Sequence, residues 1–361
     1  MATEVNGILK SLSQCSGPAG LEDEVASRLE LEFKKCGFSV SRDVIGNVIA
    51  CRGKNGKSGN GVPRIAVVAH MDEIGLAVKS ITKDGFLRFA KIGGIFDGMV
   101  SNSRVRVLVG NKKILGIVGS KPPHLMKDEE RKRLPEYDSM YVDIGAKSKE
   151  EVEKLGIRPG TLIAFDSSFD ELESGLVVGK AFDNRAGCTA LVLVARALAK
   201  ASPQGFEMVL IGSCREETGL LGSGTSVFGL DPEPSLAIAL DTNLANGTPD
   251  VSEEQSPVKI GGGPSLSSLE ASGRGFIAPQ KLIEWIEKIA KKEKIPLQHS
   301  VMEGGATDAS RMQYLKAGFL AASIGIPTRY LHSHSEVLSP KDVEAAAKLV
   351  LAIAREFKGY K

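Results

Sequence analysis

Four short apolar runs along the chain show no alternation between apolar and polar positions. This pattern is typical of strands that are buried on both faces of a parallel sheet. The runs are residues 65–69, 208–212, 236–240 and 319–326, and a further strand is predicted at 48–51, followed by a polar loop at 54–61. Helices are predicted from apolar periodicity and capping signals at 21–36, 183–200, 279–293 and from Pro340 onward. These elements predict an α/β fold in which helices flank a mixed sheet.

Residues 73–165 show a different pattern, in which short alternating segments are separated by Gly, Asn and Asp. Alternation predicts strands with one buried face, so this region is expected to form a small inserted β domain, barrel-like or a sandwich. The chain would then consist of a catalytic α/β domain at 1–72 and 166–361 and an inserted domain at 73–165. Residues 121–138 are charged and contain proline, and we expect a mobile loop or a segment ordered by a partner chain.

Composition excludes some classes of function. The 361 residues are 25% charged and carry a net charge of +2. No stretch combines clustered Lys and Arg with aromatic residues, so nucleic acid is not an expected partner. No apolar segment is long enough to span a bilayer, and the first residues lack the pattern of a signal peptide. Five cysteines without a CxxC pair indicate reduced thiols. We therefore expect a cytoplasmic protein with no membrane partner.

Five residues of metal-ligating type follow the predicted strands or begin a predicted helix. They are His70, Asp183, Glu217, Asp241 and His332. The carboxyl ends of strands in an α/β sheet meet at one edge, where such proteins build their sites. Two histidines and three carboxylates favour zinc, cobalt or manganese over calcium or magnesium. Five such ligands are enough for two divalent ions, and the adjacent Glu216 would remain available to carry a proton.

Each of these residues also has a purely structural interpretation. Asp183 could cap its helix, Asp241 could cap a turn, and the pair Glu216 and Glu217 could be a solvated loop. His70 opens the segment HMD, in which the carboxylate of Asp72 could hold the second ring nitrogen of a ligating histidine. It is the recurrence of such residues after several strands that favours a metal site.

These residues leave three functions to consider. A carboxypeptidase or deacylase of the same metal class would use an arginine to bind a carboxylate, and Arg185, Arg215 and Arg329 all lie near proposed ligands. A polysaccharide hydrolase is disfavoured by 5% aromatic residues and a single tryptophan. A non-enzymatic scaffold that assembles through the β domain is disfavoured by the complete ligand set.

Nine segments in family order make the chain resemble the TET-type (tetrahedral) aminopeptidases, dinuclear metallopeptidases labelled endoglucanase or cellulase in older naming. The segments are SGPAGLEDEV (16–25), DVIGNVIA (43–50), AHMDEIGLAV (69–78), GSKPPHL (119–125), GKAFDNRAGC (179–188), REETGLLGS (215–223), ALDTN (239–243), GGATDAS (304–310) and PTRYLHSHSEV (327–337). They span nearly the whole chain.

The resemblance implies a metal-dependent aminopeptidase that removes N-terminal residues from short peptides. Asp183 would bridge two ions, with His70 and Asp241 completing one site and Glu217 and His332 the other. The ions would be zinc or cobalt, with manganese as a further option. The resemblance also implies that Glu216 is the general base and that Asp72 orients His70. The inserted domain would mediate dimerisation, and dimers would assemble into a hollow tetrahedral dodecamer.

Substrate contacts are expected from four residues in or beside the matched segments, namely Arg329, Thr307, Asp308 and His124. The chain departs from the family pattern at four positions. Asn184 stands where a second Asp is common, His334 where Pro is common, Thr218 in place of Val, and Asn246 in place of an acidic residue. These departures remove no proposed ligand, but they leave the roles of Asn184 and His334 open.

Overall fold

The computed structural model describes residues 2–52, 62–201 and 205–359, so the predicted loop at 54–61 lies outside the described residues. Within them, a 12-stranded sheet has the order β1-β2-β12-β3-β13-β17-β18-β11-β10, extended by β14, β15 and β16 beside β17. Its strands are β1 (Ser39–Arg42), β2 (Val48–Cys51), β3 (Arg64–His70), β10 (Asp170–Glu171), β11 (Val177–Gly179), β12 (Glu207–Ser213), β13 (Leu236–Leu244), β14 (Ser265–Glu270), β15 (Phe276–Ile277), β16 (Gln298–Val301), β17 (Ala321–Arg329) and β18 (Glu336–Leu338).

The centre of this sheet is parallel and its flanks are antiparallel. β3 pairs in parallel with β12 and with β13, and β13 pairs in parallel with β17. All seven residues of β3 are buried, as its unbroken apolar run predicts for a strand covered on both faces. Because these four strands run in one direction, their carboxyl ends lie at the same edge of the sheet.

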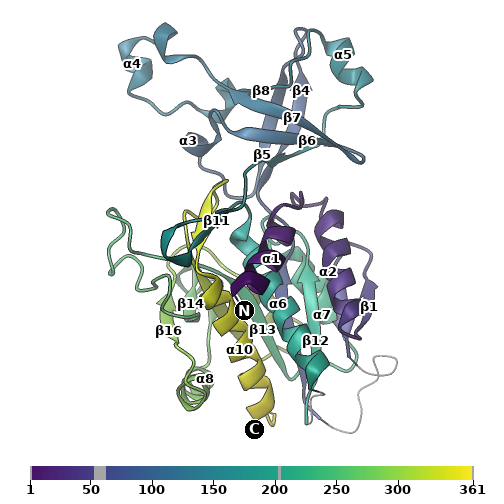
Figure 1. The fold of residues 1–361 in the computed structure, drawn as a ribbon, viewed down its shortest axis with the longest axis vertical. Coiled ribbons are helices and arrows are strands. Elements are labelled where there is room, and N and C mark those ends of the chain that lie inside the picture. The colour runs from purple at the N-terminus through teal and green to yellow at the C-terminus, as the bar shows by residue number, and fades with distance from the viewer. Residues whose placement is uncertain (1, 53–61, 202–204, 360–361) are drawn as a thin grey trace.

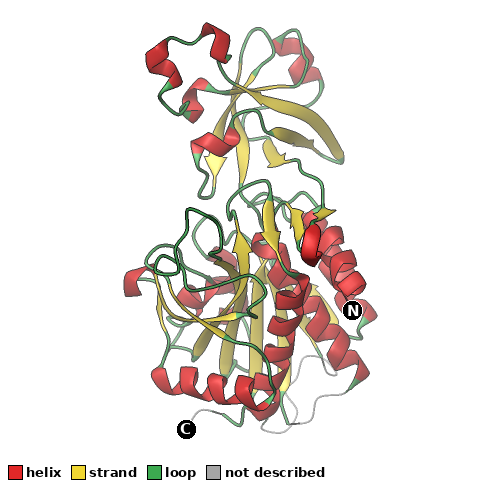
Figure 2. Ribbon diagram, turned by 60° about the vertical axis from the view of Figure 1, so that its left-hand side comes forward, coloured by secondary structure: helices red, strands yellow, loops and turns green. Residues whose placement is uncertain are grey.

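Helices cover both faces of the sheet, as Figures 1 and 2 show. They are α1 (Ala2–Ser13), α2 (Asp23–Lys35), α6 (Phe182–Lys200), α7 (Leu221–Phe228), α8 (Gln280–Lys292), α9 (Asp308–Met312) and α10 (Pro340–Glu356). One large core joins α1, α2, α6, α8 and α10 to one face, while α7 and α9 pack on the other. The predicted cap of the last helix is present, because Ser339 Oγ accepts a hydrogen bond from the N–H of Lys341 at 3.3 Å.

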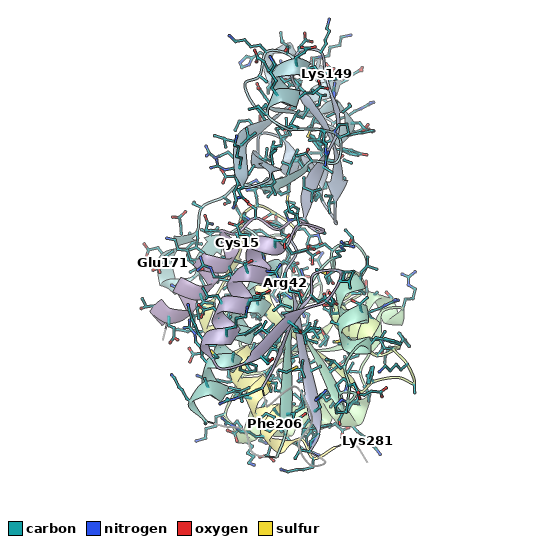
Figure 3. The ribbon with its side chains drawn as sticks, turned by 90° about the vertical axis from the view of Figure 1, so that its right-hand side faces the viewer. Cys15, Arg42, Lys149, Glu171, Phe206 and Lys281 are labelled. Carbon is teal, nitrogen blue, oxygen red and sulfur yellow. The ribbon has the colours of Figure 1, made fainter. Side chains whose placement is uncertain are left out.

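The inserted region forms a closed antiparallel barrel with strand order β4-β5-β8-β7-β6-β9. Its elements are β4 (Gly75–Ile81), β5 (Leu87–Ile92), α3 (Asp97–Val100), β6 (Arg104–Val109), β7 (Lys112–Gly119), α4 (Asp128–Arg131), β8 (Tyr141–Asp143), α5 (Lys149–Lys154) and β9 (Leu162–Phe165). The barrel has a hydrophobic core of its own. It stands apart from the α/β layers, with Lys149 at its far end and Phe206 and Lys281 at the opposite end of the molecule (Figure 3).

The described residues include no helix of the length and apolar character that crossing a membrane requires. All five cysteines are free thiols, four of them buried and Cys51 half-buried. A cytoplasmic location stays a prediction.

Candidate metal centre

The five predicted ligands line one cavity of about 410 Å³ at the carboxyl edge of the parallel strands. His70 ends β3, Asp241 lies in β13, and Glu217 follows β12. Asp183 is at the start of α6, and His332 lies in the turn after β17. Residues from five distant segments therefore meet at this edge of the sheet, where open α/β sheets place their ligand sites.

Asp183 is shared between two groups of donor atoms. Its Oδ1 lies 3.1 Å from His70 Nε2, which is 3.6 Å from Asp241 Oδ1. Its Oδ2 lies 3.5 Å from His332 Nε2, which is 3.6 Å from Glu217 Oε2. In each group the donor atoms lie within 4.8 Å of one another. The mixture of imidazole and carboxylate donors fits zinc-type divalent ions, and the two groups fit a pair of them.

Both imidazoles are oriented by backbone carbonyls on their other ring nitrogen. His70 Nδ1 lies 3.2 Å from the carbonyl oxygen of Asp72, and His332 Nδ1 lies 2.7 Å from that of Gly94. A proton on Nδ1 donated to these oxygens would leave each Nε2 available as a ligand when an ion is bound; without an ion, a protonated Nε2 donates to Asp183. Gly94 follows β5, so the inserted region helps to orient one of the candidate ligands.

Burial disfavours the charged form of the carboxylates in the centre. It raises the pKa of Glu217 to about 8, an effect to which the charge of Asp183 adds. Burial also raises the pKa of Asp241 to about 7, although His70 opposes the shift. Asp183 behaves differently: burial acts to raise its pKa, but hydrogen bonds from His332 and His70 hold that pKa well below its ordinary range. Crowded buried carboxylates are costly unless cations neutralise them, and bound divalent ions would do so.

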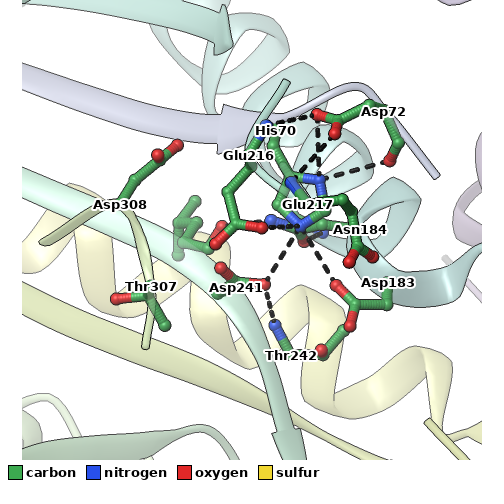
Figure 4. A network of polar contacts seen from close by, with 12 residues as sticks. His70, Asp72, Asp183, Asn184, Glu216, Glu217, Asp241, Thr242, Thr307 and Asp308 are labelled. Atoms are coloured by element: carbon green, nitrogen blue, oxygen red, sulfur yellow. Dashed lines mark hydrogen bonds and ion pairs between the residues drawn. The ribbon is translucent and has the colours of Figure 1, made fainter. Parts of the chain in front are cut away.

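Asp72 holds the backbone of the two adjacent glutamates. Its side chain is fully buried, with Oδ1 accepting the N–H of Glu216 at 2.9 Å and Oδ2 the N–H of Glu217 at 3.0 Å. Asp72 Oδ1 also lies 3.5 Å from His70 Nδ1 (Figure 4). The carboxylate of Asp72 therefore lies near His70, as expected. Its shorter contacts are the hydrogen bonds that it accepts from the loop after β12.

On the other side of the centre, Glu336 likewise accepts hydrogen bonds from two backbone N–H groups. It is 2% exposed, and its Oε2 accepts the N–H of Asp183 at 2.9 Å while Oε1 accepts the N–H of His332 at 3.0 Å. His332 has a φ of 58°, a left-handed conformation that is costly for a side chain other than glycine. The bond to Glu336 stabilises it. The sequence alone predicted no role for Glu336. An acidic residue in an apolar strand segment, four positions after His332, could have indicated one.

Glu216 lines the cavity but belongs to neither donor group. Its Oε2 is 3.9 Å from His70 Nε2. Burial raises its pKa well above the ordinary value, with Asp241 and Asp308 adding to the shift and His70 opposing it. Glu216 is therefore a buried glutamate with a raised pKa beside the candidate metal ligands.

Of the four residues predicted to contact substrate, Thr307 lines the cavity. The other three lie outside its lining among the described residues, and their substrate contacts stay predictions. Asp308 Oδ2 accepts a hydrogen bond from Ser213 at 2.7 Å, and Arg329 Nε donates to the carbonyl of Asn246 at 3.2 Å. His124 is exposed on the inserted region. Proximity in sequence to a ligand does not determine the direction of a side chain.

Asn184 and His334, whose roles were open, also lie outside the cavity lining. Asn184 is buried, donates to the carbonyl of Leu240 at 2.8 Å and accepts the N–H of Gly187 at 2.9 Å. It therefore ties the start of α6 to β13 beside Asp241. His334 contacts Ser335 Oγ at 3.0 Å and the ring of Phe165, with ring centroids 6.3 Å apart.

Comparison with known proteins agrees with this geometry. The model of the M42 glutamyl aminopeptidase family matches residues 46–349. The chain belongs to the M42 family. The solved structure of aminopeptidase APDkam598 from Desulfurococcus kamchatkensis is 34% identical, with a TM-score of 0.92 over 99% of this chain and 96% of that one.

Two further similar proteins match almost the full length of the chain. The TET1 peptidase of Pyrococcus horikoshii, which can assemble into a tetrahedron or a large octahedral shell, is 32% identical with a TM-score of 0.85 over 98% of this chain and all of its own. The lysyl aminopeptidase of Pyrococcus furiosus is 32% identical over 97% of each chain. The predicted family and fold class are confirmed, and the chain is an aminopeptidase of a metallo-hydrolase family.

Replacing Glu336 by Gln should weaken the binding of the ion held by Asp183, Glu217 and His332. The amide keeps the size of the side chain, but its nitrogen cannot accept a backbone N–H. Loss of a hydrogen-bonding partner behind a ligand typically costs about 10–100-fold in metal affinity. Elemental analysis at defined free zinc should show two equivalents in the wild type and about one in the variant.

The matched control is Asp342→Asn. Asp342 is also buried and accepts two backbone N–H groups, those of Gly261 and Gly263, but it lies outside the lining of the cavity. That variant should keep both ions. Two equivalents with unchanged affinity in Glu336→Gln would contradict the positioning of these ligands by Glu336.

Proposed function

We propose that this M42 protein removes N-terminal residues from short peptides with two divalent ions and Glu216 as general base. The observation that carries the proposal is the shared carboxylate of Asp183, with Glu216 in the same cavity but in neither donor group. His70, Asp183 and Asp241 would hold one ion, and Asp183, Glu217 and His332 the other. Zinc or cobalt suits this donor set best, and manganese is the third candidate.

Bound divalent ions supply Lewis-acid chemistry, polarising a water molecule and the scissile carbonyl. Glu216 accepts a proton from the attacking water as the new C–O bond forms. It then returns that proton to the leaving nitrogen as the C–N bond breaks. Asp72 keeps Glu216 in place through its backbone N–H, so that the same carboxylate can serve in both steps.

The absence of a cation from the cavity wall favours action at the N-terminus over action at the C-terminus. A carboxypeptidase needs a positive group to bind the substrate carboxylate, and no Arg or Lys is among the described residues that line the cavity. Arg185 is fully buried and donates to the carbonyl of Leu12 at 2.9 Å. The α-amine of a peptide needs no such cation, so this wall suits binding of the substrate at its N-terminus.

Cleavage should require a free N-terminus and a bound metal. The full-length protein is incubated with a peptide, its N-acetylated form and its C-terminally amidated form, before and after chelation and after zinc, cobalt or manganese is restored. We expect the first and third peptides to lose their N-terminal residue, with activity abolished by the chelator. Cleavage of the acetylated peptide, or a requirement for a free C-terminus, would refute the proposal.

Replacing Glu216 by Gln should keep both ions and reduce kcat by at least about 100-fold, because general acid–base catalysis contributes about 10²–10⁴-fold. Metal content and steady-state kinetics measure the two effects separately. Glu22→Gln is the control: Glu22 is buried, accepts the N–H of Arg215 at 3.1 Å and lies outside the cavity lining. Near-normal turnover in Glu216→Gln would rule out Glu216 as the general base.

We also propose that residues 1–72 and 166–361 form the catalytic domain and that 73–165 mediate dimerisation within a tetrahedral dodecamer. The assembly of the P. horikoshii relative supports this. So do apolar side chains on the insert that a partner copy would cover, such as Leu125 at 70% and Leu134 at 60% exposure. Light scattering should give about 460 kDa for twelve chains of 38.3 kDa, falling in Leu125→Asp. A monomeric wild type would contradict it.

A further inference from the structure

All ionisable side chains that line the cavity belong to the metal centre or are Glu216. The 17 described lining residues contain no Lys or Arg, and no carboxylate or imidazole apart from His70, Asp183, Glu216, Glu217, Asp241 and His332. With two divalent ions, their four positive charges equal the four negative charges of the carboxylates. The centre then has no surplus charge with which to pair a charged substrate side chain.

The rest of the wall is apolar or neutral. Leu220, Leu244, Met302 and Leu331 contribute its larger apolar side chains. They come from four segments, after β12, at the end of β13, after β16 and beside His332. The lining also includes Gly94, Gly304, Gly305 and Ala306 and the polar, uncharged residues Thr242, Asn243 and Thr307. Such a surface gains free energy by burying another apolar group.

Two buried charged groups outside the lining, Glu270 and Lys180, are bonded elsewhere, whereas the buried Asp308 bonds Ser213 through Oδ2 and has no hydrogen-bond partner at Oδ1 among the described residues. Glu270 is fully buried and accepts hydrogen bonds from the N–H and Oγ1 of Thr307 and from Ser310 Oγ. Lys180 Nζ is bonded to Glu73 at 2.6 Å and to the carbonyl of Cys15 at 2.9 Å. Neither could reach a substrate side chain without breaking buried bonds, which is costly.

We propose, building on the aminopeptidase function above, that the residue removed is apolar and of leucine or methionine size. The lysine side chain that the name of the P. furiosus relative implies, or the glutamate side chain of the family name, would enter this cavity without a counter-ion. An unpaired charge in such a site is disfavoured. The same holds on either side of the scissile bond, because no part of the wall offers a charge.

The first experiment compares kcat/KM of the metal-loaded full-length protein on the p-nitroanilides of Leu, Met, Ala, Lys and Glu. We expect Leu and Met to exceed Lys and Glu by about 10–100-fold or more, and to exceed Ala by about 10-fold or more. Calorimetric titration of the metal-loaded Glu216→Gln variant with leucinamide, lysinamide and glutamic acid amide should give the same order of affinities without turnover.

Leu244→Asp and Met302→Asp place a carboxylate in the apolar wall. At least one should raise the ratio of Lys to Leu activity by about 10-fold or more. The matched neutral variants, Leu244→Asn and Met302→Asn, should lose Leu activity without gaining Lys activity.

Each of the other outcomes overturns a defined part of the proposal. Preference of the wild type for Lys or Glu overturns the apolar specificity and leaves the aminopeptidase function intact. Absence of hydrolysis of every substrate with zinc, cobalt and manganese overturns both. A Leu preference that neither Asp variant changes overturns the assignment of this wall to the substrate side chain.

Discussion

The carboxylate of Asp183 contacts both imidazoles of the centre, one through each oxygen. This arrangement places Asp241 and Glu217 on either side of it, so that three carboxylates and Glu216 share a small buried volume. Such a concentration of negative charge opposes folding unless it is compensated. Three kinds of group can compensate this charge: backbone N–H groups, the two imidazoles and bound cations. The fold places the first two at the site, and the two donor groups could hold the third.

Two buried acids, Asp72 and Glu336, position the candidate ligands without joining either donor group. Asp72 bonds consecutive N–H groups in the loop after β12, and Glu336 joins the start of α6 to the turn after β17. The loops at a sheet edge are the flexible part of an α/β fold. Hydrogen bonds of this kind fix the geometry of these loops, which a site for two ions a few ångströms apart requires.

The contribution of the insert is not limited to its exposed surface. The carbonyl of Gly94, between β5 and α3, orients the ring of His332. The α/β layers and the inserted region therefore meet at a candidate metal ligand. An assembly formed through the barrel would involve the same inserted region whose Gly94 carbonyl orients this imidazole.

Sequence alone was sufficient for the α/β fold, the barrel-like insert and the set of polar residues at the strand ends. Apolar runs and helical periodicity are local, so β3, α6 and α10 could be placed within one to a few residues. The resemblance of nine segments identified the family. The convergence of His70, Asp241 and Glu217 follows from parallel strands, whose carboxyl ends share an edge.

Only the tertiary structure placed Glu336 and Gly94 beside the site, and only it showed that the wall of the cavity carries no charge outside the centre. Glu336 and Asp183 are 153 positions apart, and Gly94 and His332 are 238 apart. No local pattern encodes such pairs, since each depends on how distant loops are directed once the sheet has formed. The same reason explains why Thr307 lines the cavity while Arg329, which is closer in sequence to a ligand, does not.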